Sequence, residues 1–106
     1  MRRVIVESPF AGDIRRNKEY LRKALRDCLG RGEAPFASHA IYTQAGVLND
    51  LDPEERTLGI TAGLYWAAVA EATVVYLDLG ITDGMRVGIL DAQASNRPIE
   101  YRYLEH

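Results

Sequence analysis

The segment Val4-Ile5-Val6-Glu7-Ser8-Pro9-Phe10-Ala11-Gly12-Asp13 contains the clearest indication of the fold. Its three leading β-branched residues predict a short strand that is buried on both faces. The proline and the glycine that follow predict a loop, and Asp13 stands where the N-cap of a helix is expected. A buried strand that leads through a loop into a helix is the first half of a βαβ unit, which indicates an α/β fold.

The rest of the chain continues this alternation. Residues 14 to about 29 place apolar side chains on one helical face, and glycines at 30 and 32 mark the helix end. Further strands are expected at 34–37, 73–78 and 99–103, the last at an edge, and further helices at 53–69 and about 84–95. We expect a flavodoxin- or Rossmann-like three-layer sandwich with a mostly parallel sheet of four to five strands. Residues 38–52 predict a long connection with a helical turn near 39–43, and loops of this length are often functional.

Composition narrows the class of protein. At 106 residues, 47% of them hydrophobic, the chain fits one domain over residues 1–103, and Leu104-Glu105-His106 resembles the remnant of an expression tag. The net charge is −2 without a basic patch, which argues against a nucleic-acid partner. No apolar run approaches the roughly 20 residues of a membrane span, so no membrane partner is expected. A single cysteine and no apolar signal region predict a cytoplasmic protein.

The helix expected at 53–69 has an unusual composition. It begins at the N-cap Asp52 with a proline and two acids, and from Ile60 onward it is apolar nearly all round. A helix that covers a sheet needs only one apolar face. We therefore expect the second face of the 55–69 helix to bind another copy of the chain, in a dimer or a larger homo-oligomer.

Candidate site residues follow the strands, because ligands of open parallel sheets bind beyond the carboxyl ends of the strands. The first loop, Glu7 to Asp13, has Gly12 for close approach and free helix-end amides that favour anions, although Asp13 is equally well explained as an N-cap. Asp78 and Asp83 flank the turn after the strand expected at 73–78, whose pattern is the clearest of the expected strands. They suit ribose hydroxyls or acid/base work, unless Asp83 caps the next helix and Asp78 merely ends a strand.

Other site classes find little support in the sequence. His39 has no second histidine or cysteine at metal-ligand spacing, so it is either a structural histidine or a ligand contact, and no metal is expected. Neither a GxGxxG pattern nor a Walker pattern is present, and we expect no cofactor. Glu7 is the hardest of the acids to explain structurally, since a carboxylate at a buried strand end needs partners.

Several short motifs, taken in order, resemble those of the nucleoside 2-deoxyribosyltransferase superfamily. They are the first strand with Ser8-Pro9-Phe10-Ala11-Gly12, a central strand that ends in aspartate, and Asp83-Gly84-Met85-Arg86-Val87-Gly88 followed by Ala92 and Arg97-Pro98-Ile99. The resemblance covers most of the chain and implies a flavodoxin-like fold with a nucleoside or nucleotide ligand. The glutamate nucleophile of that family falls at Gly88, which can supply no carboxylate.

Two functions follow from this resemblance and from the glycine at position 88 in place of the family's glutamate. The first is an enzyme acting on an N-glycosidic bond, with Glu7 or Asp83 as nucleophile or base, Asp78 on the sugar and Phe10 under the base. The second is a binder of the same ligand that has lost catalysis. A subunit whose apolar helix serves assembly alone is a third reading. The expected ligand contacts are Ser8, Pro9, Phe10, Gly12, Asp13, His39, Gly84 and Met85.

Overall fold

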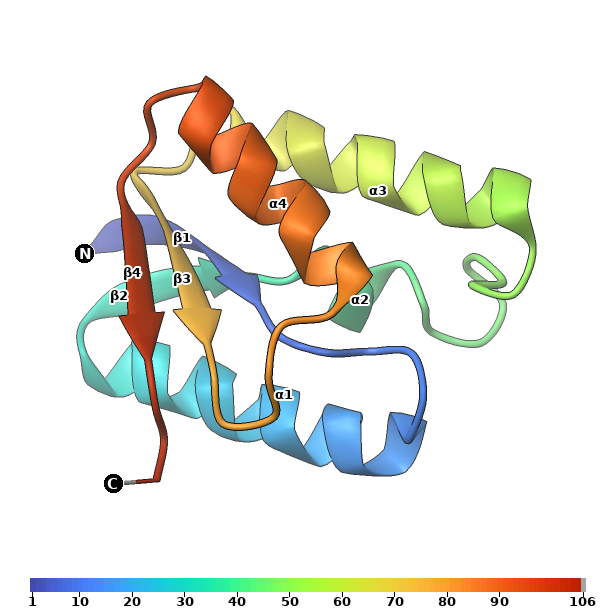
Figure 1. The fold of residues 1–106 in the computed structure, drawn as a ribbon, viewed down its shortest axis with the longest axis horizontal. Coiled ribbons are helices and arrows are strands. Elements are labelled where there is room, and N and C mark those ends of the chain that lie inside the picture. The colour runs from blue at the N-terminus through green and yellow to red at the C-terminus, as the bar shows by residue number, and fades with distance from the viewer. Residues whose placement is uncertain (106) are drawn as a thin grey trace.

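A computed structural model describes residues 1–105 and shows an α/β fold around a parallel sheet (Figure 1). The elements in chain order are β1 (Arg2–Glu7), α1 (Ile14–Gly30), β2 (Glu33–Phe36), α2 (Ser38–Ile41), α3 (Pro53–Ala67), β3 (Ala72–Tyr76), α4 (Asp83–Ala94) and β4 (Ile99–Arg102). Within the described residues the sheet has four strands in the order β2-β1-β3-β4, all parallel. The flavodoxin-like α/β architecture expected from the sequence is confirmed.

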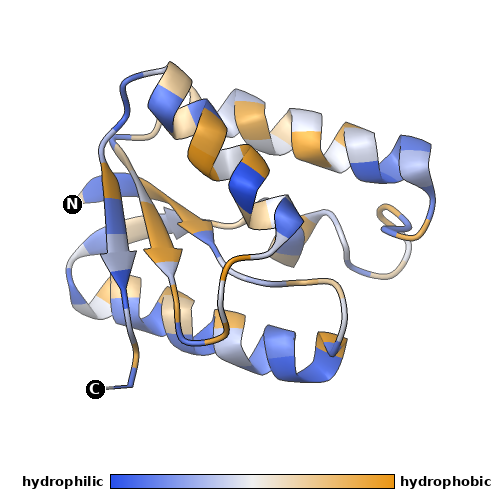
Figure 2. Ribbon diagram, viewed as in Figure 1, coloured by the Kyte–Doolittle hydropathy of each residue, from blue (hydrophilic) through white to orange (hydrophobic). Residues whose placement is uncertain are grey.

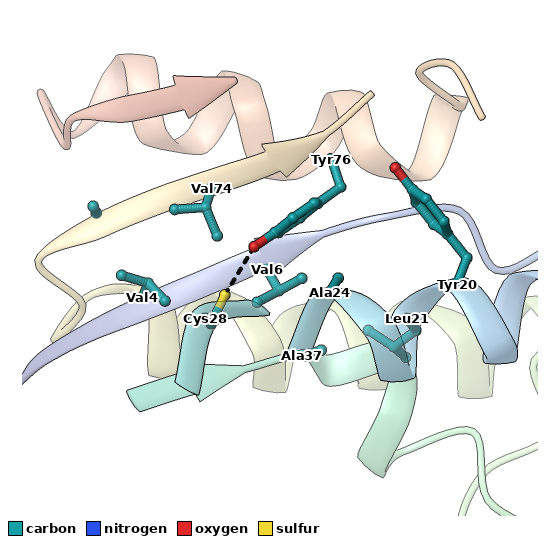
Figure 3. Close-up of a cluster of buried hydrophobic side chains, with 10 residues drawn as sticks. Val4, Val6, Tyr20, Leu21, Ala24, Cys28, Ala37, Val74 and Tyr76 are labelled. Atoms are coloured by element: carbon teal, nitrogen blue, oxygen red, sulfur yellow. Dashed lines mark hydrogen bonds between the residues drawn. The ribbon is translucent and has the colours of Figure 1, made fainter. Parts of the chain in front are cut away.

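The sheet is the middle of three layers, with α1 on one face and α3 and α4 on the other (Figure 1). Hydropathy follows this arrangement, since hydrophobic residues concentrate in β1 and β3 at the centre of the sheet (Figure 2). Side chains alternate along each strand, so Val4 and Val6 pack toward α1 in a buried cluster with Val74 (Figure 3). On the opposite face Val75 packs against Met85 and other buried residues of α4.

The element boundaries agree closely with the sequence patterns. Asp13 caps α1 by accepting a hydrogen bond from the backbone N–H of Arg16, and Asp52 caps α3 by accepting one from Glu54. The helical turn expected near residue 39 is α2, and Cys28 is fully buried beside Tyr76. β4 lies at a sheet edge, as its alternating pattern predicts.

A buried ion-pair network ties the two edge strands together. The Arg102 guanidinium donates to Glu33 at 2.7 Å, and both side chains are at most 6% exposed. Arg2 also pairs with Glu33, at 2.9 Å, and both arginines bond Glu100. These hydrogen bonds, Arg102 first, lower the pKa of Glu33 to about 2.

The apolar helix α3 packs on the sheet with only part of its surface. Ala67 is its one buried residue, whereas Leu58, Tyr65 and Trp66 are 58%, 83% and 55% exposed. The face that the sequence assigns to a second copy of the chain is therefore uncovered in a single chain. No helix among residues 1–105 is both long and apolar enough to traverse a bilayer.

Candidate functional site

A cleft lies beyond the carboxyl ends of β1 and β3, where the strand order reverses. Its volume is about 380 Å³. Seven segments contribute to its wall: β1, the β1–α1 loop, α2, the loop before α3, α3, the β3–α4 loop and α4. The lining residues are Glu7, Ser8, Phe10, Ala11, Ser38, His39, Asp50, Arg56, Ile60, Thr82, Asp83, Gly84 and Met85.

Glu7 is the last residue of β1 and directs its carboxyl group against α4. A Cβ atom placed on Gly88 would overlap the Oε2 atom of Glu7 and lie 2.5 Å from its Cδ atom. The Glu7 carboxyl group therefore occupies the space that any side chain at position 88 would need. Burial, opposed by Arg97 and reinforced by Asp91, raises the pKa of Glu7 to about 8.

Arg97 does not neutralise Glu7 by a direct bond. Its guanidinium donates to the Thr73 hydroxyl at 2.9 Å, to the Ala67 carbonyl at 3.0 Å and to Asp91 at 2.7 Å. The guanidinium is thus committed to β3, α3 and α4. Glu7 is left as a carboxyl group without a hydrogen-bonded or ion-paired partner within residues 1–105.

Ser8 and His39 form a pair in the same cleft. The Ser8 Oγ atom lies 2.7 Å from the Nε2 atom of His39. Burial lowers the pKa of His39 to about 4, so the ring is neutral at pH 7 and can accept the serine proton. The backbone of α2 is close to α3 because Gly63 has no side chain, and a Cβ there would meet Ser38 at 2.7 Å.

The β1–α1 loop is held by a residue that the sequence patterns did not single out. Asn17, which is buried in α1, donates from its side-chain amide to the carbonyls of Phe10 at 2.9 Å and Ala11 at 3.0 Å. Both of these loop residues line the cleft, whereas Gly12, with φ of 100°, lines a neighbouring groove. Asp13 is a helix cap, and neither it nor the buried Pro9 lines the cleft.

The β3–α4 loop brings a helix start to the opposite wall. Thr82, not Asp83, is the N-cap, and its hydroxyl accepts from the Met85 backbone N–H at 3.3 Å. The Asp83 carboxylate is exposed and pairs with Arg86 at 2.7 Å. Gly84 leaves room for the guanidinium of Arg56, which would lie 3.5 Å from a Cβ atom there.

Asp78 is the one expected catalytic residue that the structure does not bring to the cleft. Its carboxylate accepts hydrogen bonds from the Tyr20 hydroxyl at 2.5 Å and from the amides of Leu104 at 2.9 Å and Glu105 at 3.0 Å. Burial acts to raise the pKa of Asp78, but these bonds outweigh it and lower the value to about 2. Asp78 therefore anchors α1 and the segment after β4. Leu104 also packs against the core, and His106 lies outside the described residues.

Ser38 and Thr82 follow β2 and β3, where ligand contacts are expected, whereas sequence reasoning missed Asp50, Arg56 and Ile60, which also line the cleft. The spacing of glycines in the sequence does indicate two helix faces that other segments can approach closely. Glycines recur four residues apart at 59 and 63 in α3 and at 84 and 88 in α4. This spacing places each pair on one helix face, where it allows close approach by another segment.

Comparison with known proteins assigns the chain to a family. A family described as a domain of unknown function, DUF7768, matches residues 2–102. The chain belongs to the DUF7768 family. Its fold is similar to that of a 2-deoxyribosyltransferase from the psychrotolerant bacterium Bacillus psychrosaccharolyticus, with a TM-score of 0.67 and 17% sequence identity. That similarity covers 95% of the DUF7768 chain and 72% of the transferase chain, and no curated protein matches by sequence.

No group of three or more histidine, cysteine, aspartate or glutamate side chains in the described part of this DUF7768 protein is arranged to hold a metal ion. The side chains that line the cleft are of several chemical kinds. The cleft contains one unpaired carboxyl group, a serine–histidine pair, one arginine and an aromatic ring at the rim. This combination suits a small polar ligand with a planar apolar part.

Proposed function

We propose that this protein binds a nucleoside or nucleotide in the cleft and breaks its N-glycosidic bond. The observation that carries the proposal is the position of Glu7. A family resemblance places a catalytic glutamate at position 88, where this chain has glycine, and the Glu7 carboxyl group fills the space over that glycine. The chain thus offers a carboxyl group at nearly the same point of the cleft, supplied by β1 instead of α4.

The remaining lining residues fit the parts of such a ligand. Phe10 can stack on a planar base, and the hydroxyls of Ser8, Ser38 and Thr82 suit the hydroxyl groups of a sugar. Arg56 is the one lysine or arginine among the lining residues, which all lie in the described region. Asp83 lines the same wall but faces solvent and pairs with Arg86, so we assign the chemistry to Glu7.

A non-catalytic binder of the same ligand is the second candidate. It is favoured by the absence of a side chain at Gly88, because helix α4 then presents no carboxylate at that position. Both candidates place the ligand in the same cleft. They differ in whether a free base is released.

Two measurements test the proposal. Thermal unfolding in the presence of nucleosides, nucleoside monophosphates and cyclic nucleotides should show a rise in Tm with at least one of them. Chromatography of the same mixtures should show free base, and Glu7→Gln should abolish its release, whereas Glu19→Gln on the exposed face of α1 should not. No Tm shift with any compound contradicts both candidates, and a shift without base release leaves the non-catalytic binder.

A further inference from the structure

Glu7 lies between two spaces. In front of it is the cleft, and behind it is a smaller chamber of about 60 Å³ between the sheet, α3 and α4. The polar groups of the rear chamber include Glu7, Ser38, Asp91 and Arg97, while Ile60 and Leu64 contribute apolar wall. A chamber of this size and polarity has room for water with suitable partners, since one water takes about 30 Å³ in the liquid.

Two charged groups near Glu7 act in opposite directions, since Arg97 favours its ionised form and Asp91 opposes it. Asp91 of α4 lines the rear chamber and adds negative charge, and Arg97 is engaged in three other hydrogen bonds. On the α2 side His39 is neutral, and on the α3 side Arg56 lies 3.8 Å from Asp50. Burial is the largest effect on Glu7, and together with the Asp91 charge it outweighs Arg97 and raises the pKa of Glu7 to about 8.

A neutral carboxyl group is a poor nucleophile and a good proton donor. The cleft also contains two other carboxylates, Asp50 and Asp83, and each lies within 4 Å of an arginine side chain. Glu7 is therefore the cleft carboxyl group that is best placed to hold a proton at neutral pH. This distinguishes it from the nucleophile that glycosyl transfer requires.

We infer that Glu7 donates a proton to the departing base and that water from the rear chamber, not a second nucleobase, then attacks the sugar. The inference rests on the proposed function and specifies the reaction by which the N-glycosidic bond is cleaved. The Glu7 proton moves to a ring nitrogen of the base, the C1′–N bond breaks, and its electron pair leaves with the base. Water then bonds to C1′ and gives one proton to the Glu7 carboxylate. The sum is nucleoside plus water giving free sugar plus free base.

Asp91 is a positioning residue in this scheme, because it adds negative charge beside Glu7 and orients Arg97. Replacing it with asparagine removes that charge and frees the guanidinium. Both changes favour ionised Glu7. The proton donor should consequently be lost at a lower pH in the variant.

The test is the rate of base release between pH 5 and 10 for the wild type, Asp91→Asn and Glu7→Gln. We expect the wild-type rate to fall tenfold per pH unit above about pH 8, the fall to begin at least one pH unit lower in Asp91→Asn, and Glu7→Gln to be inactive. A rate that rises with pH from 5 to 9 overturns the donor role and leaves N-glycosidic cleavage standing. Base release that is absent at every pH overturns both.

A second arm tests the role of water. Reactions in the presence of an excess of a different free base should yield free sugar and no new nucleoside. Formation of the exchanged nucleoside overturns the hydrolytic half of the inference, again without touching cleavage itself. Glu7→Asp, which keeps the acid on a shorter side chain, should retain a measurable part of the activity that Glu7→Gln loses, and an inactive Glu7→Asp with unchanged ligand binding contradicts the donor role.

Discussion

Glu7 and Gly88 share one side-chain space. The carboxyl group at the end of β1 lies directly over the α4 backbone, at a distance that no Cβ atom on residue 88 can tolerate. The two positions are therefore coupled, since a side chain at one requires its absence or displacement at the other. This contact places a carboxyl group beside position 88, where helix α4 itself has none.

Gly88→Ala tests that coupling through stability. Alanine gains about 1 kcal/mol of helix propensity over glycine, but its methyl group collides with Glu7, and overpacking of this kind costs about 1–3 kcal/mol. We expect a net loss in urea unfolding that disappears when Glu7→Ala is combined with it. Gly30→Ala, where a Cβ meets nothing within 4 Å, is the matched control and should be neutral or slightly stabilising. Additive effects of the two substitutions at 7 and 88 would contradict a shared space.

Glu7 should also make stability depend on pH. Its pKa of about 8 in the fold is above the ordinary glutamate value of 4.5, so the native state binds the proton more tightly than the unfolded chain does. The stability it contributes is complete below pH 4.5 and is lost as the pH rises to 8, by at most about 1.4 kcal/mol per pH unit. Urea unfolding at pH 5 and pH 8 should show this loss in the wild type and not in Glu7→Gln. Parallel behaviour of the two proteins would show that Glu7 is ionised in the fold.

Gly63 controls the position of the serine–histidine pair. A methyl group at 63 would meet the Ser38 Cβ atom at 2.7 Å, whereas one at 59 would meet the end of Leu48 at 3.3 Å and the Tyr42 Cβ atom at an ordinary 3.7 Å. Gly63→Ala should push α2 from α3, destabilise the protein by about 1–3 kcal/mol and weaken ligand binding. Gly59→Ala should change both quantities much less, because a leucine methyl can move. Equal effects at the two positions, measured by urea unfolding and thermal shift, would rule out a special role for Gly63.

The Glu33–Arg102 pair should dominate acid unfolding. The pKa of Glu33 is about 2 in the fold against an ordinary glutamate value of 4.5, so its contribution to stability is present above pH 4.5 and is lost as the pH falls toward 2. Glu33→Gln removes the more buried of the two carboxylates that pair with Arg102, and breaking a buried pair costs about 3–5 kcal/mol. We expect that loss of stability at pH 7. Below pH 4.5 the free energy of unfolding of the variant should fall less steeply with pH than that of the wild type. Glu19→Gln, in an exposed pair with Arg15, should leave both nearly unchanged.

The exposed face of α3 should mediate self-association. Tyr65 of α3 and Val69, two residues after the end of α3, are 83% and 57% exposed, in a segment that the sequence makes apolar nearly all round. Light scattering should give a dimer or a larger species for the wild type, and Tyr65→Lys with Val69→Lys should give a monomer with an unchanged circular dichroism spectrum. Leu29→Lys, at an equally exposed leucine on α1, is the control. A wild type that is monomeric at every concentration would refute the role given to this helix.

The sequence by itself determined the elements and their order. The β-branched run at 4–6 and the caps Asp13 and Asp52 act through neighbours in the chain, so their effect is visible locally. Alternation of strands and helices then restricts the topology to right-handed parallel crossovers, and the carboxyl-end rule places a cleft after β1 and β3. Glu7, Ser8, Phe10 and His39 could be nominated from that rule alone.

The tertiary structure decided what those residues do, because their partners are distant in the chain. Glu7 meets Gly88, Ser8 meets His39, and Arg56 reaches Gly84 only when three crossovers have been folded. Asp78 shows the opposite outcome, since Tyr20 and the segment after β4 take up its carboxylate and remove it from the cleft. Local patterns predict which element carries a residue and at which end of the sheet that residue lies. Which group it faces, and therefore its charge and chemistry, depends on packing between segments that no short stretch of sequence specifies.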